Sequence, residues 1–121
     1  MRRTARKEYA EWLGIDAADG FIFSARVGQF KPNAFGLYDM HGNVWEWCQD
    51  FYDASYYKKS PAVDPQNETE SDYRTLRGGS WSFHPRDCRS SVRGRLLPND
   101  RSHSIGFRVA RNAEKPAVQS K

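Results

Sequence analysis

Two carboxylates flank a turn in the middle of the chain. Asp39 and Glu46 lie on either side of Gly42 and Asn43, a pair of residues that favours a tight turn. Carboxylates around irregular backbone are what a hard cation such as calcium requires. The alternative is a plain hairpin whose acids are solvated, and spacing alone favours this second interpretation.

The chain also has two cysteines, Cys48 and Cys88. Two cysteines are too few for a disulfide framework, and no metal-ligand spacing joins them. The sequence leaves two possibilities open. The thiols form one disulfide if the fold brings them together, or they stay free and partly buried.

The turn leads into a strand that carries two tryptophans. Val44, Trp45 and Trp47 are residue types that suit strands. Because Trp45 and Trp47 have the same parity, they share one face of a strand, with Glu46 on the other face. Two indoles bring enough apolar area to begin a core.

Short elements and long loops are expected around this strand. Tyr9, Trp12 and Leu13 recur at helical spacing, and Gly14 can end a helix. More than half of the chain has the pattern of turn or loop, which predicts an α+β domain with short strands and much irregular loop. The expected elements are a helix over 4–13, strands over 21–23, 73–77 and 105–110, a polar surface loop over 53–72 and an irregular segment over 82–104.

Size and composition limit the class of protein. The 121 residues, with a net charge of +4 and a pI near 9.2, form one domain at most. Four Trp, six Tyr and seven Phe are not the composition of a disordered protein. The basic residues form no recognised nucleic-acid motif. No apolar run is long enough for a signal peptide or a membrane span, so we expect a cytoplasmic protein without nucleic-acid or membrane partners.

Three blocks of sequence resemble, in order, the formylglycine-generating enzyme family, also called sulfatase-modifying factor domains. The first block is Asn33 to Trp47, the second is Leu76 to Trp81 (LRGGSW) and the third is Ile105 to Val109 (IGFRV). The resemblance implies a C-type-lectin-like fold that is rich in irregular structure. This expectation agrees with the loop-rich pattern of the sequence.

The resemblance also implies how the chain is divided. Residues 19–111 resemble the C-terminal half of the family's domain, which is about twice as long as this chain. Residues 1–18 match the family poorly, and residues 112–121 are expected to be a disordered basic tail. Because half a core leaves apolar surface exposed, we expect either another chain that supplies the missing half or self-association.

A structural calcium site is implied by the resemblance at the central turn. The family binds one calcium through an Asn or Asp, two backbone carbonyls and a Glu. The matching positions are Asp39, Gly42, Val44 and Glu46. All four positions of the set are present, which favours the calcium interpretation of the turn.

The family has a second structural calcium, for which the match is partial. Its Asp and the carbonyl two residues further on correspond to Asp19 and Phe21. Its other two donors fall near Ala5 and Arg6, where the family's Asn is absent.

The family's oxidase chemistry carries over less well. These enzymes use oxygen and copper(I), held by two cysteines after a Gly-Gly-Ser-aromatic run, to convert a sulfatase cysteine to formylglycine. Copper(I) is soft and takes thiolates in near-linear geometry, so both cysteines are needed. Here the two positions are Phe83 and Cys88, and one thiolate does not reproduce the site. Ser80 and His84 match active-site neighbours, with a turn cap and a surface loop position as their structural alternatives.

The segment 82–104 resembles the variable region of proteins that retroelements diversify, which have the same lectin-like fold. Its variable positions hold only residue types that arise from asparagine codons with randomised adenines. The fixed residues between these variable positions, among them Trp81, Pro85 and Cys88, are also found in many ordinary relatives of the family. An ordinary member with a plain surface here is therefore the favoured alternative.

Either alternative predicts a binding face on the 82–104 segment. Exposed aromatic and arginine side chains are typical anchors of interfaces. We therefore expect a non-catalytic module that binds a protein or small-molecule ligand, and the alternative is a copper- and oxygen-dependent formylglycine-generating oxidase or a remnant of one, with Cys88 and Ser80 as its candidate catalytic residues. The expected ligand-binding residues are Phe83, His84, Arg86, Arg95, Leu96, Leu97 and His103.

Overall fold

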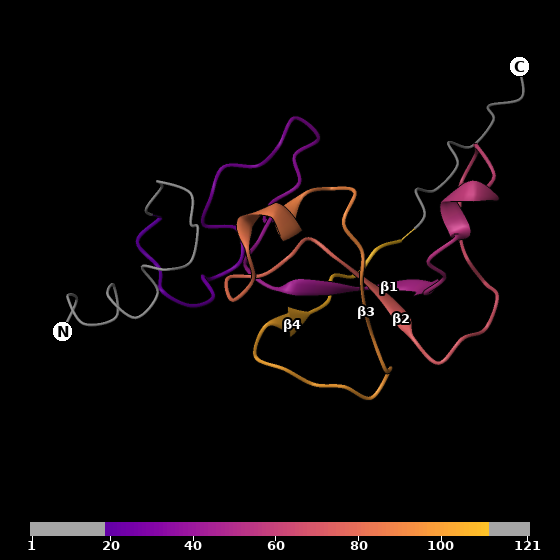
Figure 1. Cartoon of the computed structure of the whole chain (residues 1–121). Coiled ribbons are helices and arrows are strands. Elements are labelled where there is room, and N and C mark those ends of the chain that lie inside the picture. Colours follow the sequence, from indigo (N-terminus) through magenta and orange to yellow (C-terminus); the bar gives the residue numbers. More distant parts are fainter. Residues whose placement is uncertain (1–18, 112–121) are drawn as a thin grey trace, which may run out of the picture.

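The computed structural model describes residues 19–111, in which four strands form one sheet (Figure 1). The strand order is β3-β2-β1-β4. β1 pairs antiparallel with β2 and parallel with β4, and β2 pairs antiparallel with β3. The elements are β1 (Trp45–Phe51), the 3₁₀ turn η1 (Tyr56–Lys58), β2 (Arg74–Arg77), the 3₁₀ turn η2 (Pro85–Cys88), β3 (Gly94–Leu96) and β4 (Ile105–Gly106).

The tryptophan face of β1 forms the core of the sheet. Trp45 is 6 % exposed and Leu76 is 3 % exposed, and they are the buried hydrophobic residues of the described part of the chain. Trp47 lies opposite Leu76 across β1 and β2. A Cβ on Gly94 would lie 3.5 Å from the Trp45 ring, so the indole packs closely on this glycine of β3. The predicted strand after the central turn is confirmed, and it continues to Phe51.

Two of the predicted strands are corrected by the structure. Residues 21–23 form a bend, because the Asp19 carboxylate accepts the Phe21 amide (2.9 Å) and turns the chain. The strand predicted over 105–110 is paired only at Ile105–Gly106. The predicted strand over 73–77 is confirmed as β2.

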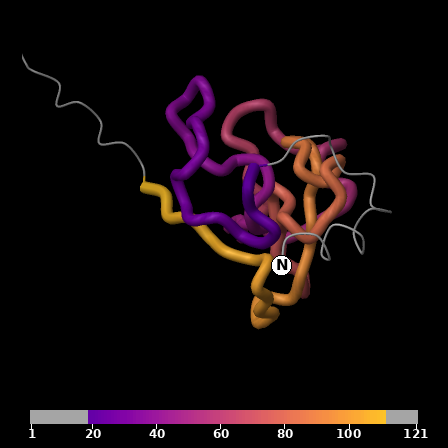
Figure 2. The backbone as a smooth tube through the Cα atoms, turned by 90° about the vertical axis from the view of Figure 1, so that its left-hand side faces the viewer, coloured from indigo at the N-terminus to yellow at the C-terminus, as the bar shows by residue number. Residues whose placement is uncertain are grey.

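The chain leaves the sheet after β4 because Arg108 binds the central turn instead. Its Nη1 donates to the Tyr38 carbonyl (3.1 Å) and its Nη2 to the Asp39 carbonyl (3.4 Å). The chain just after β4 is consequently joined to the end of segment 19–43, and the two pass close to each other in the turned view (Figure 2). Phe107, which follows β4 directly, is left 75 % exposed.

The loop predicted over 53–72 has a buried anchor. Asn67 is 4 % exposed, and its side chain donates to the Phe51 carbonyl (2.9 Å). The Phe51 amide in turn donates to the Asn67 carbonyl (3.0 Å). The loop is therefore fixed to the end of β1 and includes η1, in contrast to the purely surface loop predicted from its polar composition.

Arginines attach the same loop to the sheet by stacking on tyrosines. The Arg93 guanidinium lies 4.2 Å from the ring centre of Tyr57 and 5.2 Å from that of Tyr52. It also donates to the carbonyls of Asp53 and Ala54 (3.0 and 3.4 Å). Each guanidinium–aromatic contact contributes about 0.5–1 kcal/mol at such sites. We call the whole set the Arg–Tyr stack, which consists of Arg77, Arg93, Arg95, Tyr52, Tyr57 and Tyr73.

Several sequence expectations fall on other parts of the chain. The predicted helix over 4–13, on which the α in α+β depends, and the tail over 112–121 lie outside the described residues. Helical structure within residues 19–111 consists of η1 and η2. None of it has the length and apolar character that a membrane-crossing helix needs.

Candidate functional site

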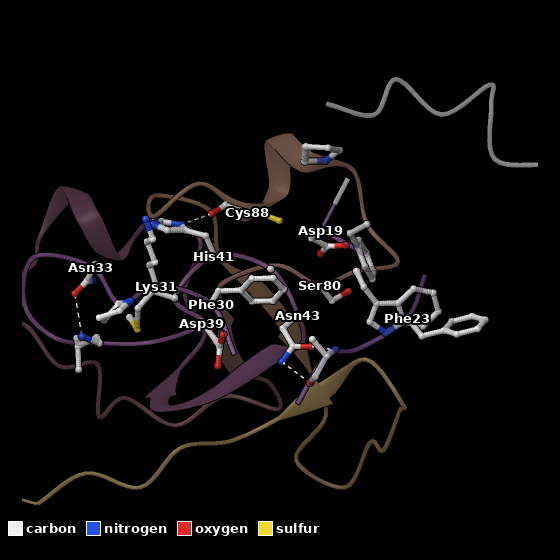
Figure 3. Close-up of a pocket in the computed structure, with 18 residues that line it drawn as sticks. Asp19, Phe23, Phe30, Lys31, Asn33, Asp39, His41, Asn43, Ser80 and Cys88 are labelled. Atoms are coloured by element: carbon white, nitrogen blue, oxygen red, sulfur yellow. Dashed lines mark hydrogen bonds between the residues drawn. The ribbon is translucent and has the colours of Figure 1, made fainter. Parts of the chain in front are cut away.

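A cavity of about 480 Å³ lies between segment 19–43 and the chain that follows β2 (Figure 3). Four of its lining side chains are aromatic, and three, those of Asp19, Lys31 and Asp39, are charged. Both candidate catalytic residues, Ser80 and Cys88, line it. The other lining residues that matter below are Phe23, His41, Asn43, Trp81 and Phe83.

The floor of this cavity depends on a glycine. Gly79 has a φ of +74°, and a Cβ there would lie 2.7 Å from the Cys88 sulfur and 2.9 Å from the Cys88 Cα. A left-handed backbone and so close an approach both require glycine. Gly79 thus allows η2 to pack directly on the chain after β2. Ser80, next along the chain, is 2 % exposed, and its carbonyl accepts the Phe83 amide (3.1 Å) in a turn.

Cys88 is half-buried and lines the cavity. Burial raises the pKa of the Cys88 thiol, and the nearby Asp87 raises it further. The closest imidazole contact is to the backbone, because His41 Nδ1 donates to the Cys88 carbonyl (2.7 Å). Since the thiolate is both the nucleophile and the metal ligand, this environment suits neither role at neutral pH.

Copper(I) does not fit the residues that are present. The position of the family's first copper cysteine holds Phe83, whose ring packs edge-on against Trp45 with centroids 5.7 Å apart. Cys48 lies on β1, away from the residues that line the cavity, and burial raises the pKa of its thiol. Both cysteines are free, which settles the alternatives left open by the sequence. Within residues 19–111 the cavity therefore offers copper one thiol.

The sequence pattern carries little sign of the aromatic wall. The Phe23 and Trp81 rings meet edge-on with centroids 5.0 Å apart, and the His103 ring lies 5.4 Å from Trp81. Trp81 Nε1 is buried without a hydrogen-bond partner in the described part of the chain. The sequence predicts a strand at Phe23, and no local pattern indicates that its ring meets Trp81.

A single asparagine holds the two walls together. The Asn43 side chain accepts from the Ala25 amide (2.9 Å) and donates to the Ala25 carbonyl (3.3 Å). Its own carbonyl accepts the Trp81 amide (3.0 Å). Asn43 has a φ of +63°, as expected for a tight turn. The turn at Gly42 and Asn43 is predictable from the sequence, whereas its second role as an anchor is not.

The predicted calcium positions lie around the same turn. Asp39 has a φ of +56°, and its carboxylate accepts the Gly28 amide (2.7 Å). Both Glu46 carboxylate oxygens accept from Arg108, at 2.5 Å each, and this bonding raises the pKa of Arg108. In residues 19–111, no three His, Cys, Asp or Glu side chains are grouped to hold a metal ion. The two carboxylates, with the carbonyls of Gly42 and Val44, remain a set of hard oxygen donors of the kind that calcium takes.

The positions of the second predicted calcium site are described only in part. Asp19 Oδ1 accepts the Phe21 amide, so one of its oxygens already has a backbone partner. Asp19 also lines the cavity. Ala5 and Arg6 lie outside the described residues.

Four of the seven predicted ligand-binding residues lie at or near the cavity. Phe83 lines it, and His103 contacts Trp81. His84 is the N-cap of η2, where its Nδ1 accepts the Arg86 amide (3.2 Å). The structural interpretation of His84, as a loop residue without a catalytic role, is therefore supported by this hydrogen bond.

The remaining three lie at β3, away from that cavity. Arg95 belongs to the Arg–Tyr stack, and Leu96 pairs with Arg74 in the sheet. Leu97 is 46 % exposed. The structure therefore divides the residues of the expected binding face between two places.

Comparison with known proteins gives consistent relatives for this chain. The formylglycine-generating enzyme of Streptomyces coelicolor is 41 % identical over 101 residues, which are 81 % of this chain and 32 % of that protein. The chain thus spans about a third of the length of this relative.

Two solved structures are similar in both fold and sequence. PvdO from Pseudomonas aeruginosa matches with a TM-score of 0.67 and 39 % identity, over 78 % of this chain and 36 % of that chain. Treponema denticola variable protein 1 matches with a TM-score of 0.65 and 31 % identity, over 88 % of this chain and 37 % of that chain. The sequence profile described as "Sulfatase-modifying factor enzyme 1-like domain" matches residues 2–113. The chain therefore belongs to the sulfatase-modifying factor family.

Proposed function

We propose that this chain is a non-catalytic member of its family that binds a ligand at the 82–104 surface and the adjoining cavity. The observation that carries the proposal concerns residues 83 and 88, the positions that match the family's two copper-binding cysteines. Phe83 packs on the core tryptophan, and Cys88 is a lone thiol whose pKa burial raises. The aromatic wall of the cavity suits binding of an apolar group better than redox chemistry.

The same proposal includes the fold and the assembly of the domain. A small sheet that carries long irregular loops supports a C-type-lectin-like arrangement. Several apolar side chains of residues 19–111 stand out into solvent, among them Phe35 and Val109, each 87 % exposed. We propose that the rest of a full-length domain covers them, supplied by a longer polypeptide, another chain or a second copy.

A copper(I) titration in the presence of oxygen and a sulfatase-derived cysteine peptide tests the lack of oxidase activity. We expect weak copper binding, which Cys88→Ser removes, and no aldehyde product by mass spectrometry. Conversion of the peptide thiol to an aldehyde would overturn the proposal. That outcome would favour the second candidate function, a formylglycine-generating oxidase. The observation that supports this candidate is that Ser80 and Cys88 line the same cavity.

A binding experiment tests the surface itself. We expect immobilised chain to retain a partner that the triple variant Phe83→Ala, Arg95→Ala, Leu97→Ala no longer retains. Phe23→Ala separates the cavity from the rest, because Phe23 is 62 % exposed and lines the cavity. Val63→Ala is the control, since Val63 is 77 % exposed and does not line the cavity. If the triple variant retains every partner of the unaltered chain, the 82–104 segment is not the binding surface.

We also propose a structural calcium ion at the central turn, held by Asp39, Glu46 and the carbonyls of Gly42 and Val44. The oxygen donors support it, although calcium has to compete with Arg108 for the Glu46 carboxylate. We expect EDTA to lower the Tm and calcium to restore it, and Glu46→Gln to remove both effects. A Tm that does not respond to either reagent would contradict this site. Asp19 and Phe21 are the described candidates for a second one.

A further inference from the structure

A second cavity, of about 500 Å³, lies beside β3 and the loop after β1. It shares no lining residue with the first cavity. Two tyrosines and one arginine of the Arg–Tyr stack line it, namely Tyr52, Tyr73 and Arg95. Glu70 and Asp72 line it as well, so cationic and anionic groups face the same space.

Arg95 is held in place by the two tyrosine rings. Its guanidinium lies 5.2 Å from the ring centre of Tyr52 and 5.4 Å from that of Tyr73. Cation–π contacts with two rings favour this position of the guanidinium and use none of its N–H donors, which remain available for hydrogen bonds. Arg95 is exposed, so these donors are accessible from solvent.

The other arginines of the stack have used their donors. Arg93 donates to two backbone carbonyls of the loop. Arg77 donates to the carbonyls of Ser90 and Val92 and to the Tyr57 hydroxyl. Within residues 19–111, by contrast, the Arg95 guanidinium has neither a hydrogen bond nor an ion pair. Arg93 and Arg77 therefore have structural roles. The N–H donors of Arg95, by contrast, remain available to bind a ligand.

The acids of this cavity define the kind of ligand. Asp53 is neutralised by Lys59 (2.8 Å), but Glu70 and Asp72 have no ion pair in the described part of the chain. A free guanidinium fork binds a carboxylate in bidentate fashion. Two unpaired carboxylates disfavour a multiply charged anion such as phosphate and attract a cation next to the bound carboxylate.

We propose that the second cavity binds a free α-amino acid. Arg95 receives the carboxylate, Glu70 and Asp72 face the ammonium group, and the Tyr52 and Tyr73 rings flank the site. Its volume of about 500 Å³ lies within the range of about 300–1,000 Å³ that is typical of small-molecule sites. This site shares Arg95 with the proposed 82–104 surface but no lining residue with the first cavity, so Arg95→Gln and Phe23→Ala tested singly distinguish the two.

A thermal-shift screen of the twenty amino acids at about 10 mM, followed by NMR titration with the strongest, tests the site. We expect Arg95→Gln to weaken binding at least tenfold, and the matched control Arg101→Gln, at another exposed arginine, to leave it unchanged. N-acetylation and amidation of the amino acid should each weaken binding by about tenfold, since each removes one charged contact. Phe23→Ala, in the first cavity, should have no effect on it.

Three results would overturn the proposal. One is the absence of any shift with all twenty amino acids. Another is equal binding to the chain and to Arg95→Gln, which would place the ligand elsewhere. The last is equal binding of inorganic phosphate and of the amino acid, which would reduce the site to a general anion contact.

Discussion

Two loops flank the sheet, and they are fixed to it by opposite kinds of chemistry. Segment 19–43 is shaped by short polar side chains that bind backbone amides, such as Asn33, which accepts from the amides of Phe35 and Leu37. The loop after β1 is held by long cationic side chains on aromatic rings, as Arg93 on Tyr57 shows. The first loop encloses a cavity with aromatic rings in its wall, and the second encloses a cavity lined mainly by polar and charged residues.

The difference shows how a chain with a small core secures long loops. Asn and Asp side chains form hydrogen bonds with nearby backbone groups and so hold their loop in place without its aromatic rings. These rings are therefore free to line a cavity. Arg–Tyr contacts instead consume the aromatic faces of their loop as structural contacts. A loop of the first kind offers apolar recognition, whereas a loop of the second kind offers polar recognition wherever a donor remains unused.

The most damaging change should be Gly79→Ala, at the junction between the first cavity and the sheet. The new Cβ would meet backbone and sulfur atoms of Cys88 at 2.7–3.0 Å, on a left-handed backbone. We expect a loss of about 3–5 kcal/mol in the free energy of unfolding, measured by urea denaturation. Gly36→Ala is the control, because Gly36 has a φ of +76° and nothing within 4 Å of a Cβ, so it should lose only about 1 kcal/mol. Equal losses in both variants would mean that η2 can move away.

Asn43→Ala should loosen the attachment of segment 19–43 to the rest of the first cavity. It removes two hydrogen bonds to Ala25 and keeps a side chain at positive φ, so we expect a loss of about 2 kcal/mol in the free energy of unfolding. Asn43→Gly tolerates the φ and should recover about half of that loss. Hydrogen exchange should show faster exchange for residues 19–43 and no change in the loop after β1. Faster exchange in both loops would show that they are not independent.

Arg93→Gln tests the second loop. It removes the two cation–π contacts with Tyr52 and Tyr57 and the two guanidinium hydrogen bonds, and because the glutamine amide can replace part of that bonding we expect a cost of about 1–2 kcal/mol in the free energy of unfolding. Arg101→Gln, at an exposed arginine without such contacts in the described residues, should be neutral. A difference between the two variants that is within error would mean that the stack is not what fixes this loop.

The smallest effect should be a pH dependence at the second loop. Hydrogen bonds from Lys59 and then from Ser55 lower the pKa of Asp53 to about 2. Because the folded-state pKa lies below the ordinary value, the stabilisation is complete above a pH of about 4 and is lost as the pH falls towards 2. Asp53→Asn should flatten the Tm profile in that window and lower the Tm slightly at pH 7 to 8, where the carboxylate of the unaltered chain is fully stabilising. A profile as steep as that of the unaltered chain would assign the acid sensitivity to other carboxylates.

Local patterns predicted the centre of the molecule well. The parity of Trp45 and Trp47 and the turn at Gly42 and Asn43 fix β1 and its buried face, because both signals depend on neighbouring residues. Two free thiols, one of the alternatives left open, are also observed. The ordered blocks that resemble the sulfatase-modifying factor family predicted the family, which the profile match over residues 2–113 confirms.

The parts that were not predicted depend on contacts between distant residues. β3 pairs with β2 although its sequence, with Gly94 and Arg95, is a poor strand signal. The strand expected up to Ala110 stops early because Arg108 finds acceptors at Tyr38 and Asp39. The division of the expected binding face has a similar origin, since the position of Arg95 is set by tyrosines from another loop.

The parallel pairing of β4 with β1 has a consequence for how the protein folds. Trp45, at the start of the first strand, finds its partner Ile105 only near the end of the described chain. Pairings of such high contact order raise the entropic cost of the transition state, so we expect folding in the range of milliseconds to seconds. Until β4 arrives, one side of β1 is an open edge beside two tryptophans. During that interval the chain is most vulnerable to misassociation, and a chaperone or an early partner would have the most to protect.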